Sequence, residues 1–253
     1  MKSNLLKKHA KSFYWASFFL PSNTLEKCSS LYNFCRTLDD IVDDDNNLEV
    51  KKEIFSKFKS DFENKNLSNQ IIKDMWSVID SENISKQIII DLFDGVETDL
   101  EEKVVINSKK DLLVYSYRVA GTVGLMMSKI LKVKNKEALK GAIDLGIAMQ
   151  LTNIARDVHE DAQRGRLYLP QQWLGENSVS AVQLVQGDQE ARQAAEKAVE
   201  RLLDLAELYY RSGYQGMRYL PMQVRLGILT ARALYRAIGD EIYPEPRIIW
   251  ERR

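Results

Sequence analysis

Acidic side chains recur at helical spacing between residues 32 and 43. Asp39 and Asp43 are four residues apart, so their carboxylates project from the same side of a helix. Tyr32 and Arg36 extend this polar stripe towards the N-terminus. Like charges at this spacing destabilise an isolated helix by about 0.2–0.5 kcal/mol, and a bound cation removes that cost. Since Mg²⁺ takes oxygen ligands and commonly combines carboxylates with substrate phosphates, the spacing indicates a cation site. The alternative is a solvated acidic helix end.

A second set of oxygen-bearing side chains follows in the other half of the chain. It consists of Gln150, Asn153, Asp157 and Asp161, spaced by three, four and four residues. This spacing again places the side chains on one helical face. Arg164 and Arg166 come next, and guanidinium groups beside a metal site can grip a diphosphate through paired hydrogen bonds. The alternative is an exposed, charged helix end.

The two acidic stripes are more informative together than separately. Helical bundles build metal sites from side chains on facing helices. Stripes facing each other across a bundle would border a cavity with carboxylates at its mouth and apolar walls inside. A diphosphate would bind at the mouth and its hydrocarbon tail would lie within, where metal ions and arginines could stabilise a departing diphosphate.

Apolar residues recur at helical spacing along nearly all of the 253 residues, and only 5 prolines and 12 glycines are present. So few breakers favour long helices over a β-sandwich. One buried face is formed by Leu31, Phe34, Leu38 and Val42, and Asn23 with Glu26 is a candidate capping box. We expect helices near 23–44, 48–64, 69–80, 84–102, 109–131, 136–162, 188–213 and 221–240, with a loop containing a short helix between 165 and 187.

These elements predict an all-α fold in which residues 1–253 form a single helical-bundle domain with a central apolar cavity. Lys plus Arg and Asp plus Glu are both 36, so the net charge is zero. This balance argues against a protein that binds nucleic acid over a broad basic face. No apolar run reaches the 18 residues typical of a membrane span. The apolar stretch 13–20 is short for a secretory signal and lacks a cleavage site, so we expect a cytoplasmic protein.

The two cysteines, Cys28 and Cys35, are seven residues apart and share one helical face. We interpret them as small buried apolar residues rather than as metal ligands or a disulfide. Gly121 and Gly124 lie within a predicted helix, where each costs roughly 1 kcal/mol relative to alanine. They make room for a substrate chain in our interpretation, and the alternative is close helix packing.

Four segments resemble the squalene and phytoene synthase family. They are HAKSF at 9–13, YNFCRTLDDIVD at 32–43, YSYRVAGTVG at 115–124 and QLTNIARDVHEDAQRGRLYLP at 150–170. The last segment is the most specific, and the similarity covers roughly residues 5–241. The resemblance implies a helical bundle of the isoprenoid synthase type.

The resemblance also implies roles for particular residues. The implied Mg²⁺ ligands are Asp39, Asp43, Asn153, Asp157 and Asp161, and these aspartates with Tyr115 are the implied catalytic residues. The implied contacts to diphosphate or prenyl chain are His9, Lys11, Ser12, Tyr32, Arg36, Gln150, Arg156 and Tyr235. Arg164, Arg166 and Tyr168 resemble part of a lid over the diphosphates. Two or three Mg²⁺ ions would bridge the diphosphate, with Mn²⁺ as an alternative, and no NADPH is expected because no strand is followed by G-x-G-x-x-G.

The reaction implied is the head-to-head condensation of two isoprenoid diphosphates through a cyclopropyl diphosphate. The segment 150–170 is most similar to bacterial members that join two C20 geranylgeranyl diphosphates to phytoene. Two alternatives stay open: a C15-specific enzyme of the dehydrosqualene, hydroxysqualene or squalene type, and a non-catalytic member acting as a scaffold. A tyrosine and the released diphosphate are both candidates for accepting the final proton.

The expected partners follow from this chemistry. They are prenyl diphosphates and no nucleic acid, with contact to a downstream desaturase as a further candidate. Hydrophobic substrates and products favour peripheral contact of the protein with the inner face of a membrane through an apolar patch. One departure concerns the C-terminus: the family usually continues after the equivalent of Tyr235 with a basic helical segment, which the resemblance does not place here.

Overall fold

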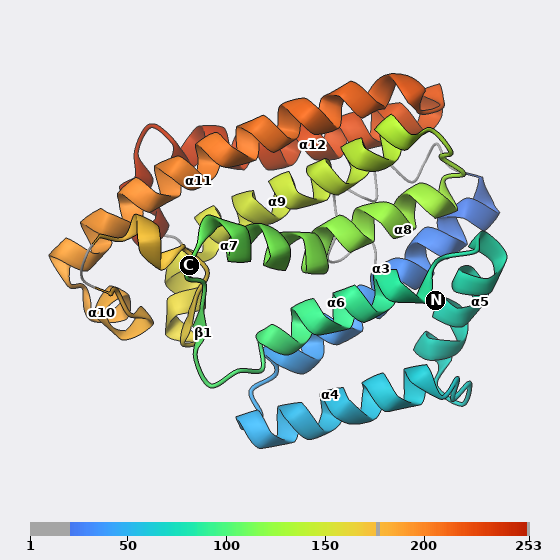
Figure 1. Cartoon of the computed structure of the whole chain (residues 1–253), viewed down its shortest axis with the longest axis horizontal. Helices are drawn as coiled ribbons and strands as arrows, with labels where there is room; N and C mark the ends of the chain where they lie inside the picture. The colour runs from blue at the N-terminus through green and yellow to red at the C-terminus, as the bar shows by residue number, and fades with distance from the viewer. Residues whose placement is uncertain (1–20, 176–177, 252–253) are drawn as a thin grey trace.

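The computed structural model describes residues 21–175 and 178–251, and for Gln223 it describes the backbone only. The predicted contacts His9, Lys11 and Ser12 therefore lie outside the described residues. Helices dominate the described chain (Figure 1). The first half holds α3 (Ser22–Asp43), α4 (Leu48–Glu63), α5 (Gln70–Glu82), α6 (Lys86–Thr98), α7 (Lys109–Ser116), the π-helical turn η1 (Tyr117–Gly121) and α8 (Thr122–Ile130). The second half holds α9 (Lys136–Gln163), η2 (Gln171–Trp173), α10 (Ala181–Gln186), α11 (Gln189–Gly216), η3 (Met217–Tyr219), α12 (Met222–Ile242) and η4 (Pro246–Trp250).

The all-α prediction and the expected helix positions are confirmed, with small differences at the ends. The helix expected at 84–102 stops at Thr98, where α6 ends. The candidate capping box is wrong, because α3 begins at Ser22 after Pro21 and has no side-chain cap. The short parallel pair of β1 (Val104–Val105) and β2 (Arg166–Leu167) was not expected. Two-residue strands are too short to show an alternating pattern.

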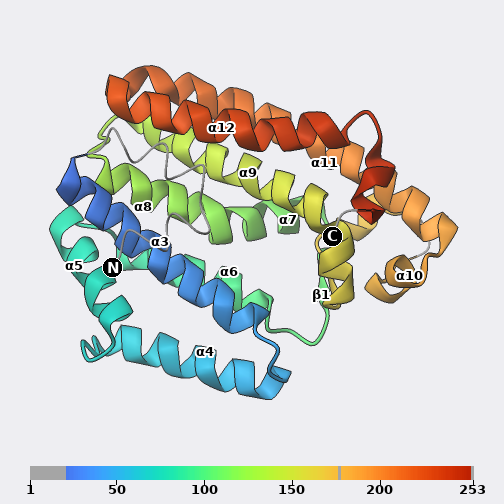
Figure 2. The same ribbon diagram turned by 180° about the vertical axis from the view of Figure 1, so that it is seen from behind.

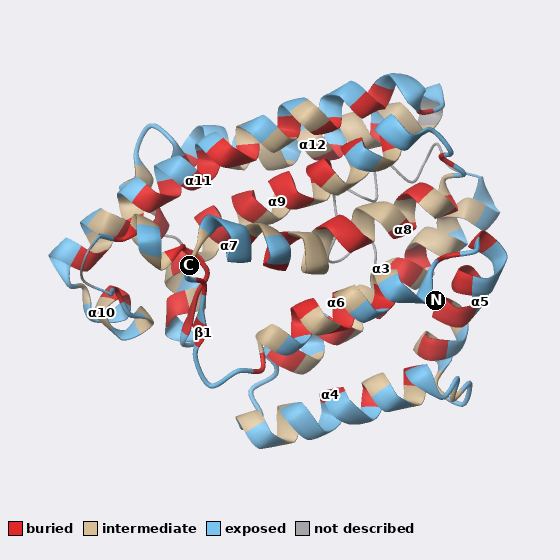
Figure 3. Ribbon diagram, in the orientation of Figure 1, coloured by how far each residue is buried: buried red, intermediate tan, exposed pale blue. Residues whose placement is uncertain are grey.

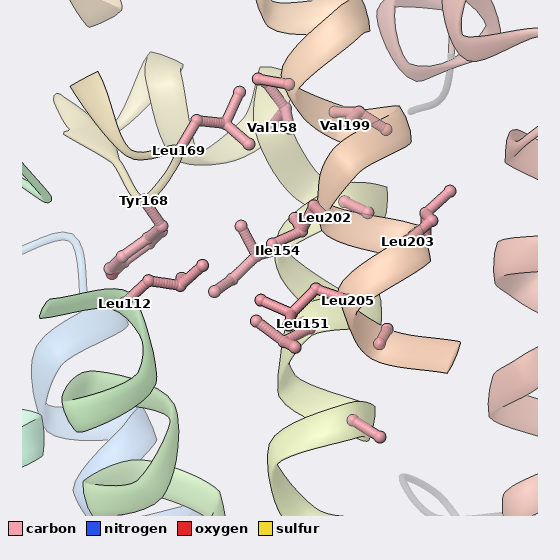
Figure 4. Close-up of a cluster of buried hydrophobic side chains, with 14 of the residues drawn as sticks. Leu112, Leu151, Ile154, Val158, Tyr168, Leu169, Val199, Leu202, Leu203 and Leu205 are labelled. Atoms are coloured by element: carbon pink, nitrogen blue, oxygen red, sulfur yellow. The ribbon is translucent and has the colours of Figure 1, made fainter. Parts of the chain in front are cut away.

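Two clusters of buried side chains hold these helices together. Figure 3 marks where buried residues lie along the helices. One cluster packs α3 to α6 against the end of α8, around Phe34 and Phe93, whose ring centroids lie 5.9 Å apart. The buried face predicted for the first helix is confirmed within it, because Leu31, Phe34, Leu38 and Val42 are all buried. The other cluster packs α9 against α11, where Leu151, Ile154, Leu202 and Leu205 meet (Figure 4).

Helices α8 and α9 approach each other closely. A Cβ on Gly124 would lie 2.3 Å from the carbonyl oxygen of Ala142, and a Cβ on Gly146 would lie 2.4 Å from that of Ala120. Gly121 also abuts α9 at Ile143. Close helix packing, the alternative interpretation of Gly121 and Gly124, therefore accounts for these glycines, although Gly124 also borders the cavity described below. No helix among the described residues is long and apolar enough to cross a membrane.

Candidate active site

A cavity of about 430 Å³ lies between the two cores. Helices α3, α6, α8, α9, α11 and α12 all contribute to its wall. Most of the wall is apolar, as at Val123, Met127, Leu145, Val224 and Ile228. Its polar lining includes Tyr32, Asp39, Asp99, Tyr115, Gln150, Asn153 and Tyr235. The cavity thus combines an apolar interior with one group of carboxylate, amide and phenol oxygens.

The two acidic stripes meet through an arginine bridge. Arg166 Nη1 donates to Asp43 Oδ1 at 2.8 Å, and Arg166 Nη2 donates to the Val42 carbonyl oxygen at 2.9 Å. Arg164 Nη1 lies 3.1 Å from Asp43 Oδ2. Strand β2 follows α9 after Arg164 and Gly165 and pairs with β1, which fixes Arg166 beside the end of α3. These contacts join the C-terminal end of α3 to the segment that follows α9.

A half-buried carboxylate that the sequence analysis missed, Asp99, lies beside this bridge. The hydroxyl of Tyr168 donates to Asp99 Oδ1 at 2.6 Å, and that of Tyr115 donates to both Asp99 oxygens at 3.1 Å. The two tyrosine rings stack with centroids 4.8 Å apart. Burial raises the pKa of Asp99 to about 6, against the opposing effects of the two hydroxyls and Arg166.

Local pattern did not identify Asp99, because the helix expected at 84–102 runs through it. In the structure Asp99 is instead the C-cap residue of α6, a position where the helix dipole disfavours negative charge. An aspartate placed there is unfavourable unless other groups stabilise it. The partners that do so are distant in sequence, so the residue has no periodic companion.

One carboxylate in each acidic stripe has a raised pKa. Asp39 is solvent-exposed and also lines the cavity. Desolvation by the surrounding protein, and after it the charge of Asp43, raises the pKa of Asp39 to about 6. Burial and the charge of Asp157 raise the pKa of Asp161 to about 8, although Arg166 and Arg164 act in the opposite direction. A cation among these carboxylates would stabilise their charged forms.

An amide oxygen between the carboxylates has no donor. Asn153 Oδ1 is buried and without a hydrogen-bond partner among the described residues. Buried polar atoms rarely stay unpaired, and a missing ion is one recognised reason. Asn153 lies on α9 one helical turn before Asp157. The orphaned oxygen and the mutually repelling carboxylates together fit a bound hard cation.

The remaining predicted residues take different positions. Tyr32, Gln150 and Tyr235 line the cavity. Arg156 binds the neighbouring Asp157 through Nε at 2.7 Å and Nη2 at 2.6 Å. Arg36 pairs with Asp40 at 2.7 Å.

The three residues assigned to a lid are not equally exposed. Arg166 and Tyr168 are buried and anchored as described, so only Arg164 lies on the surface.

As the side chains stand, no three His, Cys, Asp or Glu residues of the described ranges are grouped closely enough to hold a metal ion. Asp43 and Asp157 instead each bind arginine.

The chain is similar to proteins of one family. The family described as squalene/phytoene synthase matches residues 6–253. A protein of Rhodobacter capsulatus named phytoene synthase is 34% identical over 243 residues, which cover 94% of this chain and 71% of that protein. A 15-cis-phytoene synthase of Enterobacter agglomerans is 45% identical over 143 residues, covering 56% of this chain and 48% of that protein. The chain thus spans about half the length of that relative.

Solved structures resemble the fold over nearly the whole chain. The crystal structure of a dehydrosqualene synthase in complex with ligand has a TM-score of 0.79 and 28% sequence identity, and the match covers 96% of this chain and 86% of that one. The squalene synthase HpnC from Alicyclobacillus acidocaldarius has a TM-score of 0.80 at 18% identity, covering 97% of this chain and 93% of that one. The helical arrangement is therefore the isoprenoid synthase type.

Proposed function

This chain belongs to the squalene/phytoene synthase family, and we propose that it condenses two geranylgeranyl diphosphates head to head to phytoene. The reaction proceeds through a cyclopropyl diphosphate and releases diphosphate, which makes the chain a prenyltransferase of carotenoid biosynthesis. The relatives named phytoene synthase support this choice of substrate. The structural observation that carries it is an apolar cavity bordered by carboxylates and an orphaned amide oxygen.

Mg²⁺ fits the oxygen ligands at the polar lining of the cavity. We propose that two or three ions are held by Asp39, Asp43, Asn153, Asp157 and Asp161. The unpaired Asn153 oxygen and the raised pKa of Asp39 and Asp161 support this set. When bound, the ions neutralise the diphosphate charge and so assist its departure. Mn²⁺ is the alternative hard cation, and NADPH is not required because the proposed reaction is not a reduction.

Two arginines that bind carboxylates in this structure could bind a diphosphate instead. Arg156 and Arg164 now bind Asp157 and Asp43. Cations on those carboxylates would free the guanidinium groups for the oxygens of a diphosphate, which they can bind through paired hydrogen bonds. The family resemblance implies further contacts to the substrate, which remain proposals. Among the described residues they are Tyr32, Arg36, Gln150 and Tyr235. The others, His9, Lys11 and Ser12, lie outside the described residues.

The apolar wall of the cavity protects the reaction from water. Allylic cations would be quenched by solvent, so the site has to exclude it. The side chains of Val123, Met127 and Ile228 line the space in which the prenyl chain would lie. The final proton goes to the released diphosphate or, through the Tyr115 hydroxyl, to Asp99.

A C15-specific reaction is the second candidate, since the dehydrosqualene synthase structure matches this fold over 96% of the chain. A catalytically inactive scaffold is the third, and both intact acidic stripes argue against it. Prenyl diphosphates are the expected partners in the first two cases. Contact with a desaturase stays a prediction.

One assay separates the three candidates. Purified protein is given C20 or C15 diphosphate with Mg²⁺, and the extracted hydrocarbon is identified by mass. A C40 product from the C20 substrate supports the proposal, a C30 product from C15 alone moves the chain to the second candidate, and no product from either supports the scaffold. Asp39→Asn and Asp157→Asn should each lower turnover at least about a hundredfold without changing helix content, whereas Asp45→Asn, an exposed neighbour, should not. Near-normal rates in the first two variants would contradict the metal assignment.

A further inference from the structure

Three elements converge on the carboxylate of Asp99. The residue follows α6, and Figure 2 shows the chain leaving that helix in a loop, passing through β1 and turning back into α7. Helix α7 supplies Tyr115, and the segment after β2 supplies Tyr168. Each phenol donates to Asp99, and both tyrosines are buried, with exposed fractions of 6% and 5%. Asp99 and Tyr115 line the cavity, whereas Tyr168 is not part of its lining.

The carboxylate holds the two phenols unequally. Tyr168 makes the short contact, 2.6 Å to Oδ1, a length typical of a hydroxyl that donates to a charged oxygen. The hydroxyl of Tyr115 lies 3.1 Å from Oδ1 and 3.1 Å from Oδ2, so its proton is shared between the two oxygens. Tyr168 therefore fixes the carboxylate, and its ring, stacked on that of Tyr115, holds the second phenol in place.

The contact with Asp99 decides which end of the Tyr115 hydroxyl an occupant of the cavity would meet. A phenol carries one proton and two lone pairs, whereas an ionised carboxylate can only accept. The single proton of Tyr115 is therefore committed to Asp99. Its oxygen can offer only lone pairs to a molecule in the cavity, and the adjoining negative charge increases the electron density on that oxygen.

We propose that Asp99 is a positioning residue that makes the Tyr115 oxygen a stabiliser of positive charge in the cavity. A preorganised dipole of this kind needs no rearrangement when the charge forms, and apolar walls strengthen its effect. That the charge develops on an ionising prenyl chain rests on the proposed function; the orientation of the phenol does not. The competing explanation is a structural tie between α6, α7 and the segment after β2.

Asp99→Asn is the informative substitution because it keeps the shape of the side chain. With the amide oxygen beside Tyr168, the amide nitrogen takes the place of Oδ2 and donates to the Tyr115 oxygen. The phenol proton is then released towards the cavity, and the dipole that an occupant meets is reversed. Tyr115→Phe removes the phenol oxygen but leaves the carboxylate charge. A variant with both substitutions shows whether the two residues act together.

Asp91 and Tyr117 provide a matched control on neighbouring elements. The hydroxyl of Tyr117, in η1, donates to Asp91 Oδ2 at 3.1 Å, and Asp91 lies on α6. Neither residue is among those that line the cavity. Asp91→Asn therefore replaces a phenol-binding carboxylate by an amide, as Asp99→Asn does, without changing the cavity wall. Circular dichroism and urea unfolding verify that every variant folds.

A charged probe tests the proposal without turnover. Equilibrium dialysis at pH 8, where Asp99 with its pKa of about 6 is charged, compares two compounds in a nonionic detergent. One is a quaternary ammonium salt that carries a C20 prenyl chain, and the other is the uncharged hydrocarbon of the same shape. We expect the unaltered protein and Asp91→Asn to prefer the ammonium salt equally. Asp99→Asn and Tyr115→Phe should each reduce that preference about tenfold, and the double variant should lose no more than either alone.

Two results would overturn the proposal. If Tyr115→Phe kept the full preference for the ammonium salt, Asp99 would act through its charge alone. If Asp99→Asn kept that preference and lost only resistance to urea, the aspartate would be a structural tie.

Turnover distinguishes this proposal from the proposed function. With C20 diphosphate and Mg²⁺, we expect Asp99→Asn to lower kcat at least about tenfold while KM changes less than about twofold, since the phenol acts on a charge that forms after binding. An inactive unaltered protein whose variants lose the ammonium preference would reject the function and leave the role of Asp99 standing. Normal turnover by Asp99→Asn would instead leave the function standing and overturn the proposal.

Discussion

The Asp43 carboxylate lies 2.8 Å from the Arg166 guanidinium, although the two residues are 123 positions apart in the chain. This contact joins the end of the first acidic helix to the segment that follows the second. It brings together two stripes that local sequence pattern could only place on separate helices. Asp99 lies close to this junction, because Tyr168, two residues after Arg166, donates a hydrogen bond to it.

Removing Arg166 should loosen that junction. Its side chain is largely buried and donates both to Asp43 and to the Val42 carbonyl oxygen. Arg166→Ala leaves both acceptors without their donor, so we expect a loss of about 1–3 kcal/mol in the free energy of unfolding, measured with urea. Arg164→Ala removes a more exposed ion pair and should cost less than about 1 kcal/mol. Equal losses in the two variants would show that Arg166 does not hold the junction.

Replacing Asn153 separates metal binding from stability. Its side-chain oxygen has no partner in the folded chain, so Asn153→Ala removes no hydrogen bond to that oxygen. We expect little change in the melting temperature without metal, and an increase of at least about tenfold in the Mg²⁺ concentration that gives half-maximal activity. Asn135 is the matched control, because its side chain caps α9.

Asn135→Ala should therefore behave in the opposite way. It should lower the unfolding free energy by about 1 kcal/mol and leave the Mg²⁺ requirement unchanged. An unchanged requirement in Asn153→Ala would remove that residue from the ligand set.

A methyl group at Gly124 should disrupt the packing of α8 on α9. The new Cβ would lie 2.3 Å from the Ala142 carbonyl oxygen, which is backbone and cannot rotate away. We expect Gly124→Ala to destabilise the fold by about 1–3 kcal/mol. Gly239→Ala is the comparison, since its Cβ would meet only the flexible end of Leu203 at 3.2 Å. Helix propensity then favours alanine there, so Gly239→Ala should be neutral or stabilising.

The cysteine thiols should be unreactive in the folded protein. Burial raises the pKa of the Cys28 thiol to about 12 and raises that of Cys35 as well. Because the thiolate is the reactive form, both should react slowly with Ellman's reagent near pH 8 and rapidly after unfolding in urea. Both residues line the cavity, so an apolar occupant should slow the reaction further. Rapid reaction in the native state would show that the cavity is open to solvent at this wall.

The raised pKa of the Cys28 thiol makes the stability of the fold depend on pH. A thiol that ionises more easily in the unfolded chain than in the folded one favours unfolding once the unfolded form titrates. The contribution of Cys28 to stability is therefore complete below the unfolded pKa and falls as the pH rises towards the folded value of about 12. Cys28→Ala should weaken the loss of stability at alkaline pH, measured by urea unfolding across that range.

Much of this molecule could be predicted from local pattern. Helix periodicity depends on residues three and four apart, so α3 and α9, with their acidic stripes, could be placed from the sequence. The buried face of Leu31, Phe34, Leu38 and Val42 follows for the same reason. The similarity of segment 150–170 to one family then indicated the fold type and the class of substrate before any distance was known.

Only the tertiary structure decided which distant groups meet. Asp99 became a candidate site residue because Tyr115 and Tyr168 reach it from other elements, and Gly124 proved to serve helix packing because Ala142 lies opposite. The exposure of Met222 and Leu226 on α12 could not be predicted either. These residues are as apolar as Val224 and Ile228, which line the cavity, and differ from them only in what covers them. Periodicity determines the side of a helix on which a residue lies, whereas burial, charge and reactivity depend on what the fold places against that side.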